Sequence, residues 1–288
     1  MRKGAVIRLF ILNLNPGYDH WVLIDHPPEL PHILRGNSVA HQMNGKGLNI
    51  ARVLSMLGDY DYICMNILGG AIGRLIAQET EELAIPTVNV WVAEETRINI
   101  SVVHQYDGRN DVQVVNESGP RLTRKEVADL KRTFIDTLRQ DNMVVVSGSV
   151  VPGFTLDDLR ELAVWTRSVG ASLAVDIAGD WLNALVQEEP AILKVNDDEL
   201  RLVFDIDPEK LGDLDAFRNQ YRIRELIITY GARGAVALTP EGTLRAVPPD
   251  ITVNYAVGSG DSFFAGYLHS RRTGTSLADA LRNASSCG

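Results

Sequence analysis

The chain has 288 residues, of which 45% are hydrophobic and 23% are charged, and its formal net charge is −9. This composition is typical of a soluble globular protein that buries a large core. Acidic and basic residues are interspersed and no basic stripe is present, which argues against nucleic acid as a partner.

The sequence also argues against a membrane or an oxidising compartment. It contains no apolar run of transmembrane length, and Met1-Arg2-Lys3-Gly4 leads directly into a strand-like segment instead of a signal peptide. Cys64 and Cys287 are the only two cysteines, which is too few for a disulfide framework, and we expect both thiols to lie in the core. The predicted location is therefore cytoplasmic.

Strand-like and helix-like segments alternate through most of the chain, which predicts an α/β fold with a mostly parallel sheet and helices on both faces. No linker or repeat divides the chain, so we expect one domain over residues 1–288. The expected strands are Ala5–Leu14, Tyr62–Leu68, Thr87–Val92, Met143–Ser147, Ser172–Asp176, Ile192–Val195 and Glu225–Thr229. The expected helices are 46–57, 72–84, 124–139, 156–168, 197–204 and 261–272, with capping boxes at Thr123/Glu126 and Thr155/Asp158.

Two segments interrupt this alternation, at residues 20–42 and 96–116. Both are strand-like without a helix, and the second predicts a hairpin around Asp107-Gly108 with arms Ser101–Tyr106 and Asp111–Val115. Four short strands outside the main layer would form a small separate sheet. The competing interpretation is an ordinary meander at the edge of the main sheet.

The run Val257–Gly266, with the sequence VGSGDSFFAG, is the most informative motif. Gly258 and Gly260 permit close approach of backbone to a ligand, and the apolar residues after Asp261 fit a helix that begins there. The free N–H groups of that first turn would attract a phosphate group. A carboxylate beside a phosphate is unfavourable unless it removes the proton of an attacking hydroxyl, so Asp261 is a candidate general base. The competing interpretation is a turn followed by an ordinary N-cap.

A second glycine-rich helix start lies at Asn44–Leu54, with the sequence NGKGLNIARVL. It is not a Walker A loop, because Gly47 follows Lys46 and Ala40 stands where that motif needs its first glycine. The later run is not a dinucleotide fingerprint either, because Phe263 stands where the third glycine should be. This failure argues against a dinucleotide-dependent oxidoreductase.

Together the two segments resemble the signatures of the ribokinase-like (PfkB) carbohydrate kinase family, GGKGxNxA near the N-terminus and GAGD near the C-terminus. The resemblance implies a three-layer α/β/α ribokinase-like fold, with ATP and Mg²⁺ as cofactors. It also implies that the small sheet is a lid that closes over the substrate and excludes water, and that a homodimer forms through this lid. It covers nearly the whole chain, because further pieces match between the signatures in family order: residues 15–19, 68–73, 94–99, 146–153, 194–200 and 229–234.

The chemistry of phosphoryl transfer assigns roles at the C-terminal signature. Asp261 would deprotonate the acceptor hydroxyl, and the backbone N–H groups of Gly258, Ser259 and Gly260 would form the anion hole. The stretch Asn196–Glu199 matches the family's NxxE motif, which implies that Asn196 and Glu199 position Mg²⁺ through water. An acidic first turn that complements the helix dipole is the alternative. For the nucleotide, the resemblance implies Lys194, Asn196, Thr229, Gly231 and Gly234.

The acceptor would bind in the N-terminal half. Asp19 can accept two sugar hydroxyls, Asn49 can donate and accept, and Gly45 and Gly47 allow backbone to approach the sugar. Without the family context, Asp19 could equally be a turn residue after Asn-Pro-Gly, and Arg97 a solvated charge. The resemblance of Thr96-Arg97-Ile98-Asn99 to the branch of the family that phosphorylates sugar phosphates implies that Arg97, Asn99 and Lys46 contact the acceptor.

Several residues depart from the family pattern. Asn44 stands where the first glycine of Gly-Gly-Lys-Gly is usual, Val195 where proline is preferred, and Ser259 where alanine is common. None of these changes removes a catalytic group, and asparagine tolerates positive φ. The chain ends at Ala284–Gly288 in a helix-like segment, before the final helical elements of family members. We therefore expect either a longer native chain or an incomplete adenine pocket.

The sequence thus predicts an ATP-dependent kinase that phosphorylates a hydroxyl of fructose 1-phosphate, fructose 6-phosphate or tagatose 6-phosphate. One alternative is a kinase of an unphosphorylated sugar or nucleoside. The other is a non-catalytic protein that binds a sugar phosphate or nucleotide, against which the intact Asp261 and its glycines argue.

Overall fold

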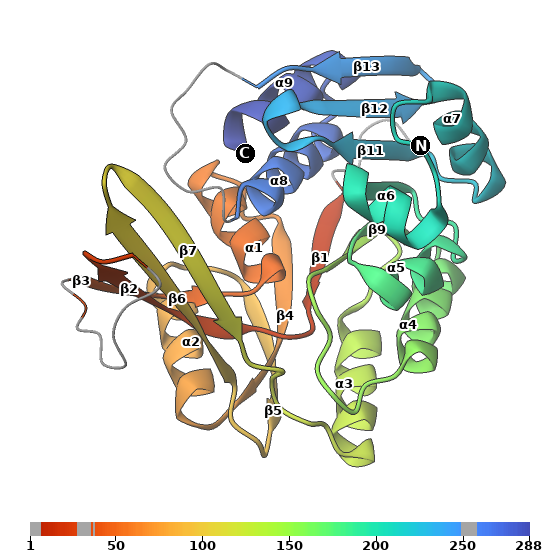
Figure 1. Cartoon of the computed structure of the whole chain (residues 1–288). Helices are drawn as coiled ribbons and strands as arrows, with labels where there is room; N and C mark the ends of the chain where they lie inside the picture. Colours follow the sequence, from red (N-terminus) through yellow and green to blue (C-terminus); the bar gives the residue numbers. More distant parts are fainter. Residues whose placement is uncertain (1–6, 28–35, 37, 249–257) are drawn as a thin grey trace.

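A nine-stranded sheet forms the centre of the molecule in the computed structural model, which describes residues 7–27, 36, 38–248 and 258–288 (Figure 1). The ladders between β5 and β11 are parallel, and β12 runs antiparallel to both of its neighbours. From one edge to the other the strands are β13 (Gly242–Ala246), β12 (Ala235–Thr239), β11 (Glu225–Thr229), β10 (Ile192–Asn196), β9 (Ser172–Asp176), β8 (Asn142–Ser147), β1 (Arg8–Asn13), β4 (Tyr62–Gly69) and β5 (Thr87–Val92).

Helices cover both faces of this sheet, as the alternation of segments predicted. Successive strand residues point to opposite faces, so Phe10 and Leu12 pack with one helix layer while Leu9 and Ile11 pack with the other. The first layer holds α3 (Arg124–Thr137), α4 (Leu156–Ser168), α5 (Gly179–Val186), α6 (Asp197–Phe204) and α7 (Leu211–Gln220). The second holds α1 (Lys46–Met56), α2 (Gly70–Glu82), α8 (Ser259–Arg272) and α9 (Leu277–Cys287). The three-layer α/β/α prediction is confirmed.

Local sequence explains where several helices begin. The predicted capping boxes are present at Thr123/Glu126 before α3 and at Thr155/Asp158 before α4, and each satisfies backbone N–H groups that have no partner within the helix. Helix α2 begins at Gly70, two residues earlier than predicted. The sequence analysis did not predict α5, α7, β12 and β13, which are short or weakly patterned, and of α9 it recognised only the end, at residues 284–288.

The predicted lid is a separate four-stranded sheet with strand order β3 (Ser38–Asn44), β2 (Gly17–Ile24), β6 (Arg97–Tyr106) and β7 (Arg109–Asn116). Its first part begins three residues earlier and ends two residues later than the predicted range 20–42, of which residues 28–35 and 37 lie outside the described residues. The hairpin between β6 and β7 turns at Asp107 and Gly108, which both have positive φ, as expected for its turn type. The meander interpretation is wrong, because no strand of this sheet pairs with the large sheet.

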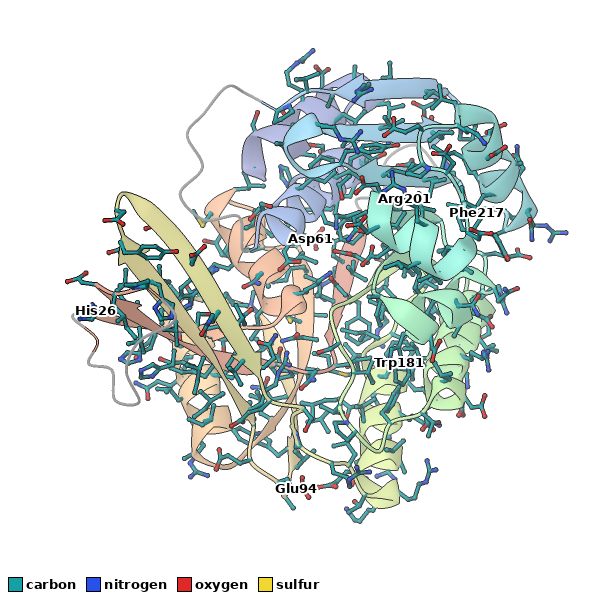
Figure 2. The ribbon with its side chains drawn as sticks, in the orientation of Figure 1. His26, Asp61, Glu94, Trp181, Arg201 and Phe217 are labelled. Carbon is teal, nitrogen blue, oxygen red and sulfur yellow. The ribbon has the colours of Figure 1, made fainter. Side chains whose placement is uncertain are left out.

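The chain reverses its direction across the large sheet beside β1. From β1 it proceeds outward through β4 and β5, and it later returns to β8 on the other side of β1. Open α/β sheets bind ligands beyond the carboxyl ends of the strands at such a reversal. Figure 2 shows His26 at the outer end of the lid and Trp181 and Arg201 on α5 and α6, on opposite sides of this central region.

The two cysteines are free and differ in environment. Cys64 on β4 is fully buried, as predicted, whereas Cys287 at the end of α9 is partly exposed, so the expectation of a core thiol is wrong for Cys287. Among the described residues, no helix has the length and apolar character that crossing a bilayer requires.

Candidate active site

The amino end of α8 carries the Gly-Ser-Gly-Asp motif, with Val257 outside the described residues. Gly258 has a φ of 85° and is the N-cap of α8, and no side chain of the described residues caps this helix. Asp261 therefore is not the N-cap, which was the competing interpretation. The first backbone N–H groups of a helix lack internal partners, so those of Ser259 and Gly260 are available to an anion.

Asp261 is buried, with 6% of its surface exposed, and it accepts a hydrogen bond of 2.8 Å from Nδ2 of Asn49 on α1. This bond joins the two glycine-rich motifs, which are 212 residues apart in the sequence. Burial, together with the nearby charge of Asp176, raises the pKa of Asp261 to about 6. A carboxylate with a pKa close to the operating pH is suited to general-base catalysis.

Two lysines share a buried carboxylate next to Asp261. The Nζ atoms of Lys46 and Lys194 lie 3.2 Å and 3.1 Å from the two oxygens of Asp176, which is 1% exposed at the end of β9. A Cβ on Gly260 would lie 3.4 Å from Nζ of Lys194, so α8 approaches this pair closely. The sequence analysis missed Asp176, although an acidic residue at the carboxyl end of a predicted parallel strand was the available signal.

The charges in this cluster shift one another's pKa values. Burial raises the pKa of Glu199, and Asp176 raises it further. Burial would also raise the pKa of Asp176, but Lys194 and Lys46 lower it below its ordinary value. Burial would lower the pKa of Lys46, yet the surrounding carboxylates raise it, Asp176 most strongly. The ammonium group of Lys46 is therefore held in its charged form.

The predicted acceptor residues Asp19 and Asn99 are brought together by the lid. Asp19 on β2 is 3% exposed, and its Oδ1 accepts a 2.9 Å hydrogen bond from Nδ2 of Asn99 on β6. Its Oδ2 accepts from Nδ2 of Asn44, the last residue of β3. Asp19 is thus not a turn residue, because it lies inside a strand and each of its carboxylate oxygens accepts a hydrogen bond from an amide.

Gly45 and Gly47 have a packing role that the sequence analysis did not foresee. A Cβ on Gly45 would come within 2.6 Å of the Asn13 side-chain oxygen, and a Cβ on Gly47 within 2.6 Å of Cβ of Asn13. Real side chains do not pack so closely, so both glycines allow α1 to begin against the end of β1. Gly45 also has a φ of 127°, which strongly favours glycine.

Arg97 begins β6 and is partly buried, so it is not the solvated charge of the competing interpretation. Its two terminal nitrogens donate to the backbone carbonyls of Asn15 and Glu117, at 2.8 Å and 3.2 Å. Its Nε is buried and has no hydrogen-bond partner among the described residues. Burial lowers the pKa of Arg97, although Asp19 and Glu117 oppose this shift.

The predicted nucleotide residues lie at the ends of β10 and β11. Asn196 and Glu199 form a capping box at the start of α6, in which each side chain accepts from the other residue's backbone N–H. The Thr229 hydroxyl donates to the carbonyl of Val195 at 3.4 Å. Gly231 begins the short 3-10 helix η1 (Gly231–Arg233). Gly234 lies so close to β13 that a Cβ would meet the Ala246 oxygen at 2.1 Å.

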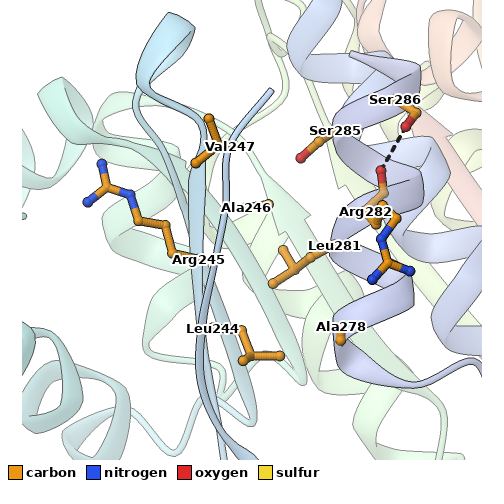
Figure 3. A pocket seen from close by; sticks show the side chains of 9 residues that line it. All are labelled: Leu244, Arg245, Ala246, Val247, Ala278, Leu281, Arg282, Ser285 and Ser286. Atoms are coloured by element: carbon orange, nitrogen blue, oxygen red, sulfur yellow. Dashed lines mark hydrogen bonds between the residues drawn. The ribbon is translucent and has the colours of Figure 1, made fainter. Parts of the chain in front are cut away.

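Two cavities flank α9. The larger, of about 360 Å³, lies between β13 and α9 and is lined by Leu244, Arg245, Ala246, Val247, Ala278, Leu281, Arg282, Ser285 and Ser286 (Figure 3). The smaller, of about 240 Å³, lies at the amino end of α8 and is lined by Asn49, Arg52, Val53, Gly258, Ser259, Ser262, Cys287 and Gly288. The smaller cavity adjoins the predicted anion-binding motif at Gly258 and Ser259, whereas the sequence analysis did not predict a cavity between β13 and α9.

Comparison with known proteins identifies the class to which this fold and site belong. Residues 20–288 match the model of the pfkB family carbohydrate kinases, and the chain belongs to that family. It is therefore an ATP-dependent carbohydrate kinase.

Among its relatives are a 1-phosphofructokinase of Haloferax volcanii, 30% identical over 93% of this chain and 85% of that protein, and a tagatose-6-phosphate kinase of Staphylococcus epidermidis, 29% identical over 90% and 83%. Solved structures with the same fold include a putative phosphofructokinase from Staphylococcus aureus, with 26% identity, a TM-score of 0.81 and coverage of 97% and 90%. Phosphofructokinase-2 from Escherichia coli, in complex with substrates and products, has 22% identity, a TM-score of 0.89 and coverage of 97% and 91%.

We predict that Asp176→Asn shifts the pH dependence of catalysis. Because the charge of Asp176 raises the pKa of Asp261, its removal should move the acidic limb of kcat/KM, expected at about pH 6, to lower pH. The measurement is kcat/KM against pH, below the melting temperature of both proteins. The control is Asp157→Asn, whose carboxylate is 91% exposed on α4. An acidic limb that does not move would contradict this coupling.

Proposed function

We propose that this protein transfers the γ-phosphate of ATP to a hydroxyl of a phosphorylated ketohexose, with Asp261 as the general base. The observation that carries the proposal is the 2.8 Å hydrogen bond between Asn49 and Asp261. It places a carboxylate with a pKa of about 6 between the glycine-rich start of α1 and the first turn of α8. The relatives named 1-phosphofructokinase and tagatose-6-phosphate kinase support this class of substrate.

In the proposed reaction, Asp261 takes the proton of the acceptor hydroxyl as its oxygen forms a bond to the γ-phosphorus. The bond from that phosphorus to the bridging oxygen breaks, and ADP leaves. The N–H groups of Ser259 and Gly260, with the positive end of the α8 dipole, stabilise the charge on the transferring oxygens. Lys194 adds positive charge, since its Nζ lies close to Gly260. The lid would exclude water as a competing acceptor.

The cavity between β13 and α9 is our candidate site for the adenine ring. It shares α9 with the smaller cavity at the amino end of α8, because Ser285 and Ser286 line the first and Cys287 and Gly288 the second. A nucleotide lying along the end of α9 would therefore extend from the apolar strip of Leu244 and Leu281 toward Gly258. Thr229, Gly231 and Gly234 would border its sugar and phosphates.

Magnesium would bind mainly through the nucleotide phosphates and water, near Asn196 and Glu199. The described residues contain no cluster of three or more His, Cys, Asp or Glu that could hold a metal by itself. Glu199 uses one oxygen in the capping box, which leaves the other for a water of the ion. The residues therefore fit an ion that keeps several waters and takes one or two carboxylates. Bound Mg²⁺ would neutralise charge on the phosphates.

The preference for a phosphorylated acceptor rests on Arg97 and Lys46. Arg97 lies in the lid near Asp19, and in the part of the chain that the structure describes its buried Nε has no partner. Lys46, at the start of α1, contributes a second positive charge, and its Nζ lies 3.2 Å from Oδ1 of Asp176. One observation favours a kinase of an unphosphorylated sugar: Arg97 already donates to two backbone carbonyls, which leaves fewer of its N–H groups for a phosphate.

We further propose a homodimer that forms through the lid, in a cytoplasmic protein. The lid exposes Ile100 on β6 and Val115 on β7, which lie opposite one another on the same face, and exposed apolar residues that adjoin one another are typical of a protein interface. The solved structures of the same fold include a tetrameric inhibited form of phosphofructokinase-2 from Escherichia coli. The two free cysteines agree with a reducing compartment.

Asp261→Asn should abolish most turnover while the fold persists. Loss of a general base lowers kcat by about 10² to 10⁴-fold, because the amide cannot accept the proton. Folding raises the pKa of Asp261, so its ionised form destabilises the folded state above pH 6. The melting temperature of the variant at pH 7.5 should therefore equal or exceed that of the wild type. A near-native rate would remove Asp261 from the reaction.

Arg97→Ala should separate phosphorylated from free sugars. A charge-assisted contact with phosphate corresponds to about a 10- to 150-fold loss in kcat/KM for the sugar phosphate. We expect little change with the free sugar or with ATP, and only partial rescue by Arg97→Lys, because an ammonium lacks the planar fork. An equal proportional loss on both acceptors would assign Arg97 to the structure of the lid and favour the free-sugar kinase.

Glu199→Gln should raise the Mg²⁺ concentration needed for half-maximal rate, because an amide oxygen is a weaker ligand than a carboxylate. Sugar affinity measured without nucleotide should not change. Asp198→Asn is the matched control, since Asp198 lies in the same helical turn and its side chain is 80% exposed. Identical Mg²⁺ curves for all three proteins would leave Glu199 with its capping role alone.

A further inference from the structure

Asn44 is the residue at which this chain departs from the first glycine of the family signature. It is the last residue of β3 and directly precedes Gly45, the N-cap of α1. A glycine at this position would contribute backbone only. The asparagine instead places a carboxamide between the lid and α1, and the contacts of that group were not foreseeable from the sequence.

The carboxamide of Asn44 is bonded at both ends. Its Nδ2 donates to Oδ2 of Asp19, and its Oδ1 accepts from the N–H of Gly45 and, at 3.1 Å, from Nδ2 of Asn49. Nδ2 of Asn49 also donates to Asp261. One side chain thus connects the carboxylate assigned to the acceptor with the residue that holds the general base.

Asn44 also changes what Asp19 can offer to a sugar. Both oxygens of Asp19 already accept from amides, Oδ1 from Asn99 and Oδ2 from Asn44, and the side chain is buried. A bare carboxylate only accepts hydrogen bonds, whereas a carboxamide both donates and accepts. A hydroxyl that approaches Oδ2 must therefore displace the Asn44 amide or bind next to it. Asn44 itself remains partly exposed and within reach of a ligand.

We propose that Asn44 is a specificity-determining residue for the acceptor. With glycine at this position, Oδ2 of Asp19 would be free to accept a hydrogen bond from one sugar hydroxyl. In this chain the Asn44 amide already donates to that oxygen, so the hydroxyl must fit both Asn44 and Asp19, and only one configuration of it does so. This inference rests on the proposed function. A site that reads a hydroxyl through fixed polar groups discriminates strongly, because a mismatched hydroxyl leaves those groups without partners.

The test compares tagatose 6-phosphate with fructose 6-phosphate, which differ in configuration at one carbon. We expect the preference of the wild type for one of the two sugars, measured as the ratio of their kcat/KM values, to fall by about tenfold or more in both Asn44→Gly and Asn44→Ala. This is the change that loss of one discriminating hydrogen bond implies. The KM for ATP should not change. A ratio of kcat/KM values does not depend on the fraction of active enzyme, so partial misfolding cannot imitate the result.

Asn116→Ala is the matched control. Asn116 is an exposed asparagine on β7, paired in register with Asn99, and its loss should leave the ratio unchanged. If both Asn44 variants lose activity equally on the two sugars, Asn44 supports the site without selecting the acceptor, and the inference is wrong while the proposed function stands. If the wild type phosphorylates neither these acceptors nor fructose 1-phosphate, the proposed function fails and this inference fails with it.

Discussion

The site depends on one buried carboxylate that two lysines share. Asp176 is 1% exposed, and an isolated charge in such a place would be strongly unfavourable without partners. Lys46 from α1 and Lys194 from β10 supply them, so segments about 150 residues apart in the chain converge at the end of β9. In the proposed reaction, the two positive charges beside the first turn of α8 attract the phosphate. Burial has the largest effect on the pKa of Asp261 and raises it, the charge of Asp176 raises it further, and Lys46 and Lys194 oppose this shift.

Two adjoining hydrogen-bond systems therefore make up the candidate site. The phosphate side contains Asp176, its two lysines and the amino end of α8, which are fixed to the large sheet. The acceptor side contains Asp19, Asn99 and Asn44, which belong to the lid. Asn49 joins them, because its amide donates to Asn44 and to Asp261. If Asp261 is the general base, as we propose, a movement of the lid would act on it through Asn49 and link acceptor binding to the chemistry.

Several glycines and acidic residues serve the fold as well as the site. Gly45 and Gly47 make room for Asn13, Gly234 makes room for β13, and the carboxylate of Glu199 caps α6. A ligand role and a packing role are compatible, since a backbone that packs closely against a strand end is also rigid where a substrate would contact it. A family motif of this kind therefore reflects both packing and ligand binding. Loss of activity in a variant of such a residue does not by itself distinguish a packing role from a ligand role.

The sequence by itself determined the α/β class, the separate lid sheet, most helices and strands of the large sheet, and the two motifs that meet at Asp261. Those features follow from periodicity, capping residues and glycine spacing, which are local properties of the chain. The sequence did not reveal Asp176, the cavity between β13 and α9, or the contacts of Asn44, and it placed Cys287 in the core. The tertiary structure decided these four features, because each depends on which ends of strands and helices lie next to one another. Local sequence patterns do not contain that information.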